Sequence, residues 1–387
     1  DYVSKSFPAY IGTDNSVTDT YAALDSAEDK MKFNTGLAQA VLSAADITPA
    51  AKESVSAGEE TLEIDGLDMG SYLVMINGSN RIYQPIVVNI VPEYIEDKWT
   101  ISNGTLGGEE IAAKYSTPSL ILETVSGGKT GAIGDIVDFK VTFDVPQLSM
   151  GVSDHTVWVS DAAEKGFAVQ SETFSVKGIT AAGEEEALTE NTDYVVNPDP
   201  VLPGTEGSSF VISFNNYESI SDYARIVITY SAEITANAAD TISGAAGIKN
   251  TAKLHYYTNG NPVSPIEDSV TLYTYGIKVT KTGDNLEALS GAEFRIYLDE
   301  GNGVQANNLV SFMSTGQGIY RPVTIADNSW EVATATDLKT DSSGLLRIDG
   351  LNTGKYLIVE SKAPDGYIKL SQPVELEIKD AGGVIDG

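Results

Sequence analysis

Two residues near the end of the chain have the types and positions needed for nucleophilic and acid–base chemistry inside a protein core. Residues 277–281 alternate as a strand does, so Lys281 shares a face with the two apolar residues of that run. The same count over residues 356–360 places Glu360 on an apolar face. The alternation therefore predicts a lysine and a carboxyl group that both point inward.

Burial determines what such a pair can do. Either ion alone would be costly to bury, so Lys281 and Glu360 should pair or become neutral. A neutral amine is a nucleophile, and a neutral carboxylic acid beside it can polarise an amide carbonyl and shuttle protons. The product would be an intramolecular isopeptide bond. Two other interpretations stay open from the residues alone: a plain buried ion pair, or a strand in the opposite phase with Lys281 extended to solvent.

The composition limits the class of protein and its partners. The 387 residues are enough for roughly two to four domains. With 24 Lys and Arg against 55 Asp and Glu, the net charge is −31. A field of this sign repels nucleic acid and anionic membranes, so we expect neither as a partner. The absence of cysteine excludes disulfides and thiolate metal sites, and we predict no metal or cofactor.

Most of the sequence predicts antiparallel, immunoglobulin-like β-sandwiches. Apolar and polar residues alternate over short runs separated by Gly, Asn, Asp or Pro, as in residues 137–143, 210–214, 226–230 and 254–256. The exception is residues 18–56, where we expect one or two short helices broken near Gly36 and at Pro49. The fold class is therefore mostly β, with short helices inserted near the start.

Two boundaries divide the chain into three predicted domains. Pro118 cannot donate to a central strand, and a new strand begins after residues 273–276. The predicted domains are residues 1–117, 118–274 and 275–387. Residues 64–74 resemble residues 348–358, so the first and third domains should share a topology within an elongated molecule.

The last predicted domain resembles a CnaB-type domain of Gram-positive surface proteins. The resemblance rests on residues 277–283 and 289–294, and above all on residues 354–367, which match the segment called the E-box in that family. It implies that Lys281 is the bond-forming lysine and Glu360 the catalytic acid. The family's acceptor is an Asn or Asp on a last strand, which we expect after Gly387. We therefore interpret the sequence as a piece of a longer precursor.

The middle domain resembles that of sortase-assembled backbone pilins, in residues 132–139, 191–194, 228–232 and 249–254. The resemblance implies that a first-strand lysine would join Asn250 on the last strand, with Asp161 as the acid. Aligning residues 120–125 on that first strand puts Glu123 where lysine is expected. Alternation predicts that Glu123 faces inward with Ile121 and Val125. We therefore expect this domain to lack its bond.

The first domain carries a candidate for linkage between subunits. It has no E-box glutamate in residues 72–76, so no isopeptide bond is predicted there. Residues 83–90, Trp99 and then Lys114 resemble the pilin-motif end of backbone subunits. In that family a sortase joins the motif lysine to the C-terminal threonine of the next subunit, which implies Lys114 for this role and Lys98 as second choice. An ordinary exposed linker lysine is the other interpretation.

These features predict a structural subunit of an extracellular, cell-wall-anchored pilus. The expected partners are identical subunits and a pilus-specific sortase, with minor pilins and host surface molecules as further candidates. The alternative is an ancillary or tip adhesin that binds host matrix or glycan. We expect no enzyme activity, because His155 and His255 have no triad-like spacing to Ser or Asp. Phosphate-binding, dinucleotide and zinc-protease motifs are also absent from the sequence.

Overall fold

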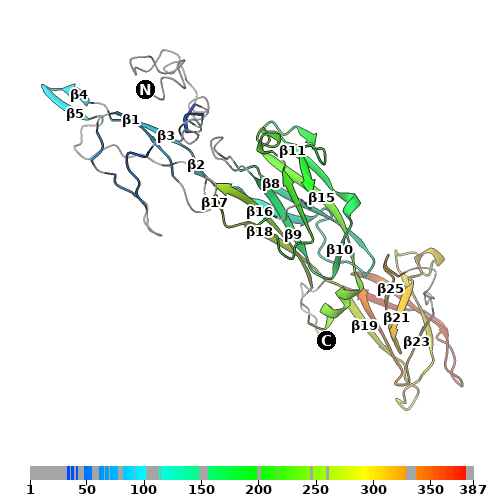
Figure 1. Cartoon of the computed structure of the whole chain (residues 1–387). Helices are drawn as coiled ribbons and strands as arrows, with labels where there is room; N and C mark the ends of the chain where they lie inside the picture. The colour runs from blue at the N-terminus through cyan, green and yellow to red at the C-terminus, as the bar shows by residue number, and fades with distance from the viewer. Residues whose placement is uncertain are drawn as a thin grey trace.

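The chain is mostly β, as predicted, and its described strands form three groups along one long direction (Figure 1). The computed structural model describes residues 115–380 apart from 147, 149–155, 198–201, 215, 245–246, 259–260 and 328–336. Before residue 115 it describes residues 33–34, 36–38, 41, 48–54, 61–64, 66–68, 70–76, 82–90, 92–101 and 113. The strand groups follow one another in chain order, with β1 to β5 at one end and β19 to β26 at the other.

Short antiparallel pairs make up the described part of the first group. β1 (Gly70–Val74) pairs with β3 (Ile86–Ile90), β2 (Ile82–Tyr83) pairs with β6 (Tyr115–Ser116), and β4 (Pro92–Ile95) pairs with β5 (Lys98–Ile101). Between β4 and β5, Glu96 and Asp97 have positive φ angles of 50° and 61°. Two such residues in succession form the tight hairpin turn whose twist suits antiparallel strands.

Within residues 18–56 the predicted helix is present, but the break predicted near Gly36 is not. Residues 33–34, 36–38 and 41 are helical, so Gly36 lies in a helix where a break was predicted. Phe33 and Leu37, four residues apart on one helical face, are buried, and so is Ala38. Their burial offsets the roughly 1 kcal/mol that glycine costs inside a helix. Residues 48–54, around Pro49, are not helical.

The second group is a sandwich of two sheets. One sheet has the strand order β12-β11-β15-β8-β7, with β10 also paired to β15; the other has the order β13-β14-β9-β16-β17, with β18 also paired to β16. The strands are β7 (Leu120–Thr124), β8 (Ile136–Asp144), β9 (Val157–Ala163), β10 (Phe167–Val169), β11 (Ser175–Ile179), β12 (Glu185–Ala187), β13 (Tyr194–Val196), β14 (Phe210–Phe214), β15 (Arg225–Ile234), β16 (Ile248–Thr258), β17 (Asn261–Pro262) and β18 (Ile266–Leu272).

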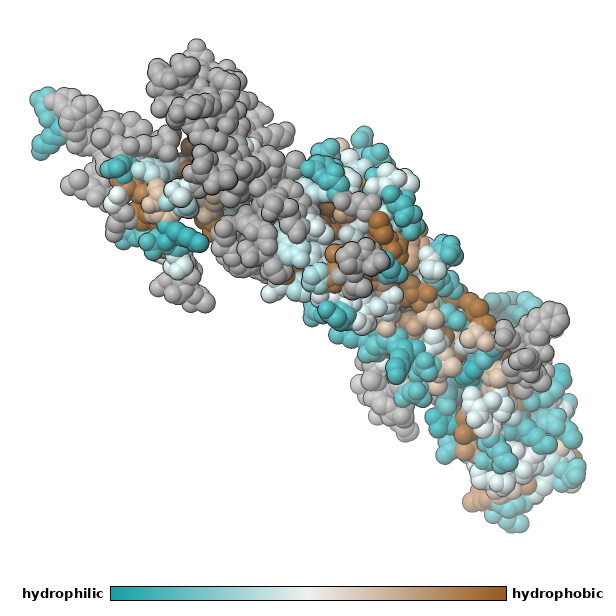
Figure 2. Space-filling model, in the orientation of Figure 1, coloured by the Kyte–Doolittle hydropathy of each residue, from teal (hydrophilic) through white to brown (hydrophobic). Residues whose placement is uncertain are grey.

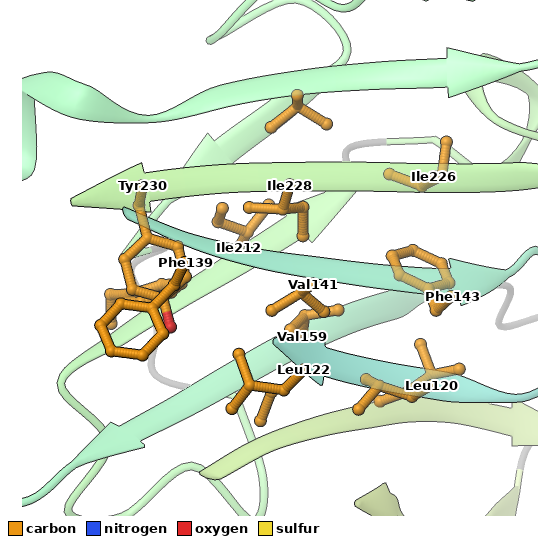
Figure 3. Packing of buried hydrophobic residues seen from close by; sticks show 14 of the residues in the cluster. Leu120, Leu122, Phe139, Val141, Phe143, Val159, Ile212, Ile226, Ile228 and Tyr230 are labelled. Atoms are coloured by element: carbon orange, nitrogen blue, oxygen red, sulfur yellow. The ribbon is translucent and has the colours of Figure 1, made fainter. Parts of the chain in front are cut away.

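Strict alternation builds the core of this sandwich. On β8, Phe139, Val141 and Phe143 are fully buried, while the residues between them are partly exposed. On β15, Ile226, Ile228 and Tyr230 point toward the same interior, and Figure 3 shows these side chains interleaved between the two sheets. A period of two therefore gives each sheet one apolar face, and the two faces bury each other.

The third group is a smaller sandwich with its own core. One sheet has the strand order β19-β24-β22-β21, and the other has β23-β20-β25-β26. The strands are β19 (Tyr275–Thr280), β20 (Glu293–Leu298), β21 (Phe312–Gly316), β22 (Ile319–Pro322), β23 (Leu338–Lys339), β24 (Leu345–Leu351), β25 (Gly354–Lys362) and β26 (Val374–Ile378). Its core gathers buried residues between Ala292 and Ile358, with Ile277, Val279, Val310, Leu376 and Ile378 packed against them, and is separate from the core of the second group.

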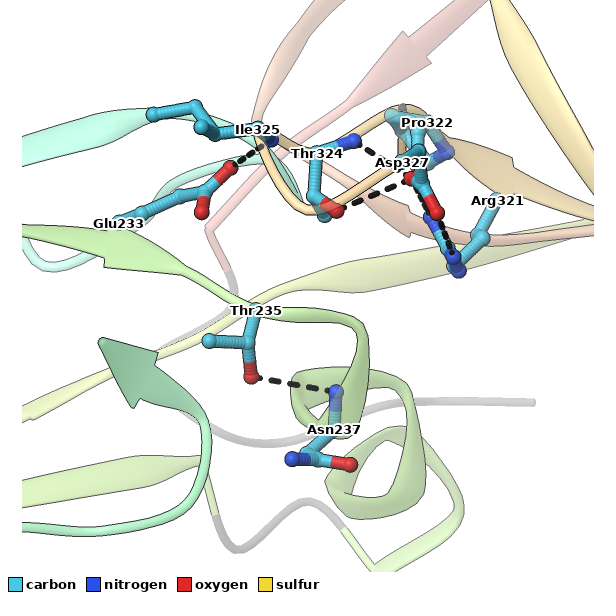
Figure 4. A network of polar contacts seen from close by, with 8 residues as sticks. All are labelled: Glu233, Thr235, Asn237, Arg321, Pro322, Thr324, Ile325 and Asp327. Carbon is cyan, nitrogen blue, oxygen red and sulfur yellow. Dashed lines mark hydrogen bonds and ion pairs between the residues drawn. The ribbon is translucent and has the colours of Figure 1, made fainter. Parts of the chain in front are cut away.

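Hydrogen bonds join the second and third groups. The Ile133 N–H donates to the Gly350 carbonyl at 2.8 Å. The buried carboxyl group of Glu233 accepts a hydrogen bond from the Ile325 N–H at 2.5 Å, as Figure 4 shows. Each of these hydrogen bonds gives a partner to a backbone N–H of the neighbouring sandwich, so the linker is not the only connection between the two sandwiches.

The loop that carries Ile325 is itself braced. Arg321 and Asp327 form two hydrogen bonds of 2.6 and 2.8 Å (Figure 4), and these hold the pKa of Asp327 below its usual value. Gly134 approaches this loop so closely that a Cβ atom would lie 2.1 Å from the Val323 carbonyl oxygen. Only glycine fits there.

Hydrophilic side chains cover most of the coloured surface of the third group in Figure 2, in keeping with the acidic composition. Within the described ranges, no helix is both long and apolar enough to cross a membrane. The same residues contain no group of three or more His, Cys, Asp or Glu placed to hold a metal ion.

Candidate functional site

Lys281 and Glu360 meet inside the third group. Lys281 directly follows β19, and Glu360 lies on β25 in the facing sheet. The Lys281 Nζ lies 3.0 Å from Glu360 Oε1; the Glu360 side chain is fully buried, and that of Lys281 is 18% exposed. Ile277 and Val279 are half-buried like Lys281, while Lys278 is exposed. The structure therefore places both candidates on inward faces and brings them together.

The two carboxyl oxygens of Glu360 are held differently. Oε2 accepts a hydrogen bond from the Leu370 N–H at 2.8 Å. Oε1 is in ion-pair contact with Lys281, but the direction of approach is not that of a hydrogen bond. A carboxyl group anchored through one oxygen and free to bond through the other can pass a proton between the amine and a third group.

Backbone hydrogen bonds fix Lys281 at the end of β19. Its N–H donates to the Gly344 carbonyl at 2.8 Å, and its carbonyl accepts from the Leu289 N–H at 2.9 Å. Among the described strands, β19 pairs with β24 alone. The second edge of β19, next to the lysine, is paired with none of the described strands.

Asp161 and Asn250 also lie together, in the core of the second group, and Tyr230 joins them. The Tyr230 hydroxyl donates to Asp161 Oδ2 at 2.6 Å, and Asn250 Nδ2 donates to the Tyr230 hydroxyl at 2.6 Å. Burial raises the pKa of Asp161 to about 7 and that of Tyr230 well above 10. Sequence reasoning missed Tyr230. Its inward phase on β15 was the available signal, since a buried tyrosine hydroxyl needs a partner.

The prediction that Glu123 faces inward with Ile121 and Val125 is wrong. Ile121 and Val125 are 52% and 57% exposed, and Glu123 forms an outer-surface ion pair with Lys140 at 2.7 Å. The buried residues of β7 are Leu120, Leu122 and Thr124. A shift of one residue turns every side chain of a strand to the other face. The first strand therefore presents leucine and threonine to the core, and it contains no lysine in either phase.

His255 makes a contact that the sequence did not predict. Its Nε2 lies 2.8 Å from the Ser160 Oγ, and its ring stacks on Trp158 with centroids 5.1 Å apart. Burial, with a smaller contribution from Lys253, lowers the pKa of His255 to about 4. Because Ser160 and His255 are both buried, a substrate carbonyl cannot reach the hydroxyl, and the pair is structural in character. His155 lies outside the described residues.

Lys114, the predicted linkage residue, lies outside the described residues. Its neighbour Tyr115 belongs to β6, and the rings of Tyr115 and Tyr83 lie 5.7 Å apart. Lys98, the second choice, is exposed on β5.

Tandem sandwiches with separate cores, of which the C-terminal one holds the Lys281–Glu360 pair, define a class of immunoglobulin-like and prealbumin-like multidomain proteins. Residues 275–386 match the family model SpaA, described as a prealbumin-like fold domain. The chain is 26% identical over 343 residues to the trypsin-resistant surface T6 protein of Streptococcus pyogenes serotype M6. The match covers 79% of this chain and 55% of that protein, so the chain spans about half the length of this relative.

Solved structures share the fold. The T6 backbone pilin of serotype M6 Streptococcus pyogenes, which has a modular three-domain structure, superposes with a TM-score of 0.59 at 23% identity, over 91% of this chain and 70% of that one. The major pilin SpaD of Corynebacterium diphtheriae gives a TM-score of 0.51 at 20% identity, over 81% of this chain and 72% of that one. The predicted resemblance to Gram-positive backbone pilins is confirmed.

Proposed function

We propose that this chain is the backbone subunit of a cell-surface pilus, a wall-anchored fibre in which a sortase joins identical subunits covalently. The observation that carries the proposal is the buried Lys281–Glu360 pair. A buried ion pair is weak as a stabilising device, because its desolvation offsets most of its attraction, whereas the same pair has a chemical use. The similarity to the T6 protein over 79% of the chain supports the same role.

The chemistry proposed for this pair is amide formation with an Asn side chain. The Lys281 Nζ, as the neutral amine, attacks the side-chain carbonyl carbon, and a new N–C bond forms. Glu360 takes a proton from Nζ and delivers it to the amide nitrogen, whose C–N bond breaks so that ammonia leaves. With an Asp acceptor, water leaves instead. A strand along the second edge of β19 would bring the acceptor beside Lys281.

Intact mass tests this bond. In subunits purified from producing cells, we expect a mass one ammonia or one water below that of the sequence, and a cross-linked peptide that contains Lys281. Lys281→Arg and Glu360→Gln, both close in shape, should restore the full mass. A full mass in the unsubstituted subunit would sink the proposed bond.

The proposed divisions of the chain and the linkage site belong to the same proposal. We assign residues 1–117, 118–274 and 275–387 to three domains, and the linkage between subunits to Lys114. We also propose that the middle domain forms no isopeptide bond, because Asp161 and Asn250 are buried there but the sequence of β7 contains no lysine.

Sortase assembly tests the linkage. Incubation with a pilus sortase and a sorting-signal donor should give a ladder of polymers that Lys114→Arg abolishes, while Lys98→Arg leaves the ladder intact. A normal ladder from Lys114→Arg together with a lost ladder from Lys98→Arg would move the role to Lys98.

A further inference from the structure

Three buried groups in the middle domain leave two oxygen atoms without a hydrogen-bond donor. Asp161 and Asn250 are fully buried, and Tyr230 is 1% exposed. The tyrosine hydroxyl gives its single proton to Asp161 Oδ2 and accepts from Asn250 Nδ2. Asp161 Oδ1 and Asn250 Oδ1 are then both buried acceptors with no partner. Buried acceptors of this kind are rare and costly in native proteins.

A proton on Asp161 Oδ1 would give both atoms a partner. We propose that Asp161 is a neutral carboxylic acid in the folded protein, whose Oδ1–H donates to Asn250 Oδ1 and so closes a ring of three hydrogen bonds with Tyr230. Each member of this ring donates once and accepts once, so every side-chain oxygen of the cluster has a partner. The ring goes beyond the proposed pilus function and does not depend on it.

The charges around Asp161 support the neutral form. The residues that face it are Tyr230 on β15, Asn250 and Ala252 on β16, and Phe210 on β14, of which only Tyr230 can ionise. Lys253, next to Ala252, is partly exposed on the opposite face and pairs with Glu267 at 3.3 Å. No described lysine or arginine forms an ion pair with Asp161. A carboxylate would therefore be a buried charge with no cation beside it, and burial outweighs the hydrogen bonds from Tyr230 and Asn250 that favour the charged form.

The ring joins the two sheets of the sandwich. Tyr230 belongs to the sheet that contains β8 and β15, whereas Asp161 and Asn250 belong to the sheet that contains β9 and β16. Phe139 stacks on the Tyr230 ring with centroids 5.4 Å apart, as Figure 3 shows, and Phe210 meets it edge-on at 4.8 Å. This aromatic shell excludes water, which strengthens the hydrogen bonds it encloses. The ring thus connects the sheets without a covalent bond, in a domain whose first strand has no lysine.

Asp161→Asn is the matched test, because asparagine keeps the shape, can donate through an N–H in place of the O–H, and cannot ionise. The measurement is hydrogen exchange of peptides from β9, β15 and β16 in the whole chain. A native pKa of about 7 lies above the ordinary 3.8, so the stabilisation is complete below about pH 4 and is lost as the pH rises through about 7. Hydrogen exchange gives the equilibrium constant for the opening that exposes each amide. The ratio of this constant in the wild type to that in Asp161→Asn should rise about tenfold per pH unit across this window.

This ratio cancels every titration that the two proteins share, including that of His255. Asp138→Asn, at an exposed carboxylate on β8 that accepts from Ser231, is the control and should leave the ratio to wild type flat. A flat ratio for Asp161→Asn, with protection lost equally at every pH, would overturn the proposal.

Carbon-13 NMR of aspartate-labelled wild-type protein measures the titration of Asp161 directly, so this test does not depend on whether a variant folds. The Asp161 side-chain carboxyl carbon should titrate with a midpoint near 7 in the folded chain. A midpoint at or below the ordinary 3.8 would mean that Asp161 is a carboxylate near neutral pH, and this result would also overturn the proposed ring.

Discussion

Removing the amine of Lys281 should destabilise the C-terminal domain more than removing the charge of Glu360. In chains whose mass shows no bond, Lys281→Met leaves the fully buried Glu360 without a cation beside Oε1. Breaking a buried pair from one side costs about 3–5 kcal/mol. Glu360→Gln keeps an oxygen for the Leu370 N–H. It also leaves Lys281, which is 18% exposed, able to extend toward water. The expected cost of this second change is about 1–2 kcal/mol.

The measurement is urea unfolding of the whole chain, followed by hydrogen exchange of peptides from β19, β20 and β25. The double variant Lys281→Met with Glu360→Leu removes both charges and should recover most of the stability lost in Lys281→Met. The reasoning is refuted if Lys281→Met lies within about 0.5 kcal/mol of the wild type, or if Glu360→Gln is the more damaging change.

Three further predictions concern the middle domain and its junction with the C-terminal domain, where Gly134 meets the loop that carries Ile325. The pKa of His255, about 4, lies below its ordinary 6.5, so the stability of the wild type relative to His255→Gln should fall by up to about 3 kcal/mol as the pH drops from about 6.5 to 4; a constant difference would contradict this. Gly134→Ala places a Cβ 2.1 Å from the Val323 carbonyl oxygen and should speed hydrogen exchange on both sides of the junction, at a cost of about 1–3 kcal/mol. Gly127→Ala, where φ is also positive but nothing lies within 4 Å, should leave exchange at the junction unchanged, and equal effects of the two would argue against the contact. Glu123→Lys should form no bond to Asn250 and change stability by less than about 1 kcal/mol, since position 123 faces solvent; a mass one ammonia low would contradict the outward phase.

Strand phase could be predicted where apolar and polar residues alternate strictly. Residues 356–359 are all apolar, so the inward phase predicted for Glu360 rested on counting along the strand from Tyr356 and Ile358 rather than on alternation. In residues 277–281 the alternation is unambiguous, and Lys281 lies 3.0 Å from Glu360 in the structure. In β7 it is not, because Leu120, Ile121 and Leu122 are three apolar residues in succession. Either phase then satisfies the local pattern, and packing across the sandwich decides. The sequence therefore could not settle the direction of Glu123.

The contacts of Tyr230 and His255 depend on pairings between distant strands. Tyr230 meets Asp161 only because β15 and β9 face each other from opposite sheets, and His255 meets Ser160 only because of the register between β16 and β9. Neither contact can be predicted from local alternation, because the packing of the whole sandwich determines which distant strands meet and in which register. A similar limit applies to Gly36, where burial of Phe33 and Leu37 overrides the helix-breaking tendency of glycine.

The proposed role as a covalently joined fibre subunit is tested most directly by peptide mapping of fibres isolated from cells that produce this chain. We predict a branched peptide in which the Lys114 side chain carries the C-terminal threonine of another subunit. Fibres in which Lys114 occurs only in linear peptides, and whose subunits separate fully in denaturant, would contradict that role.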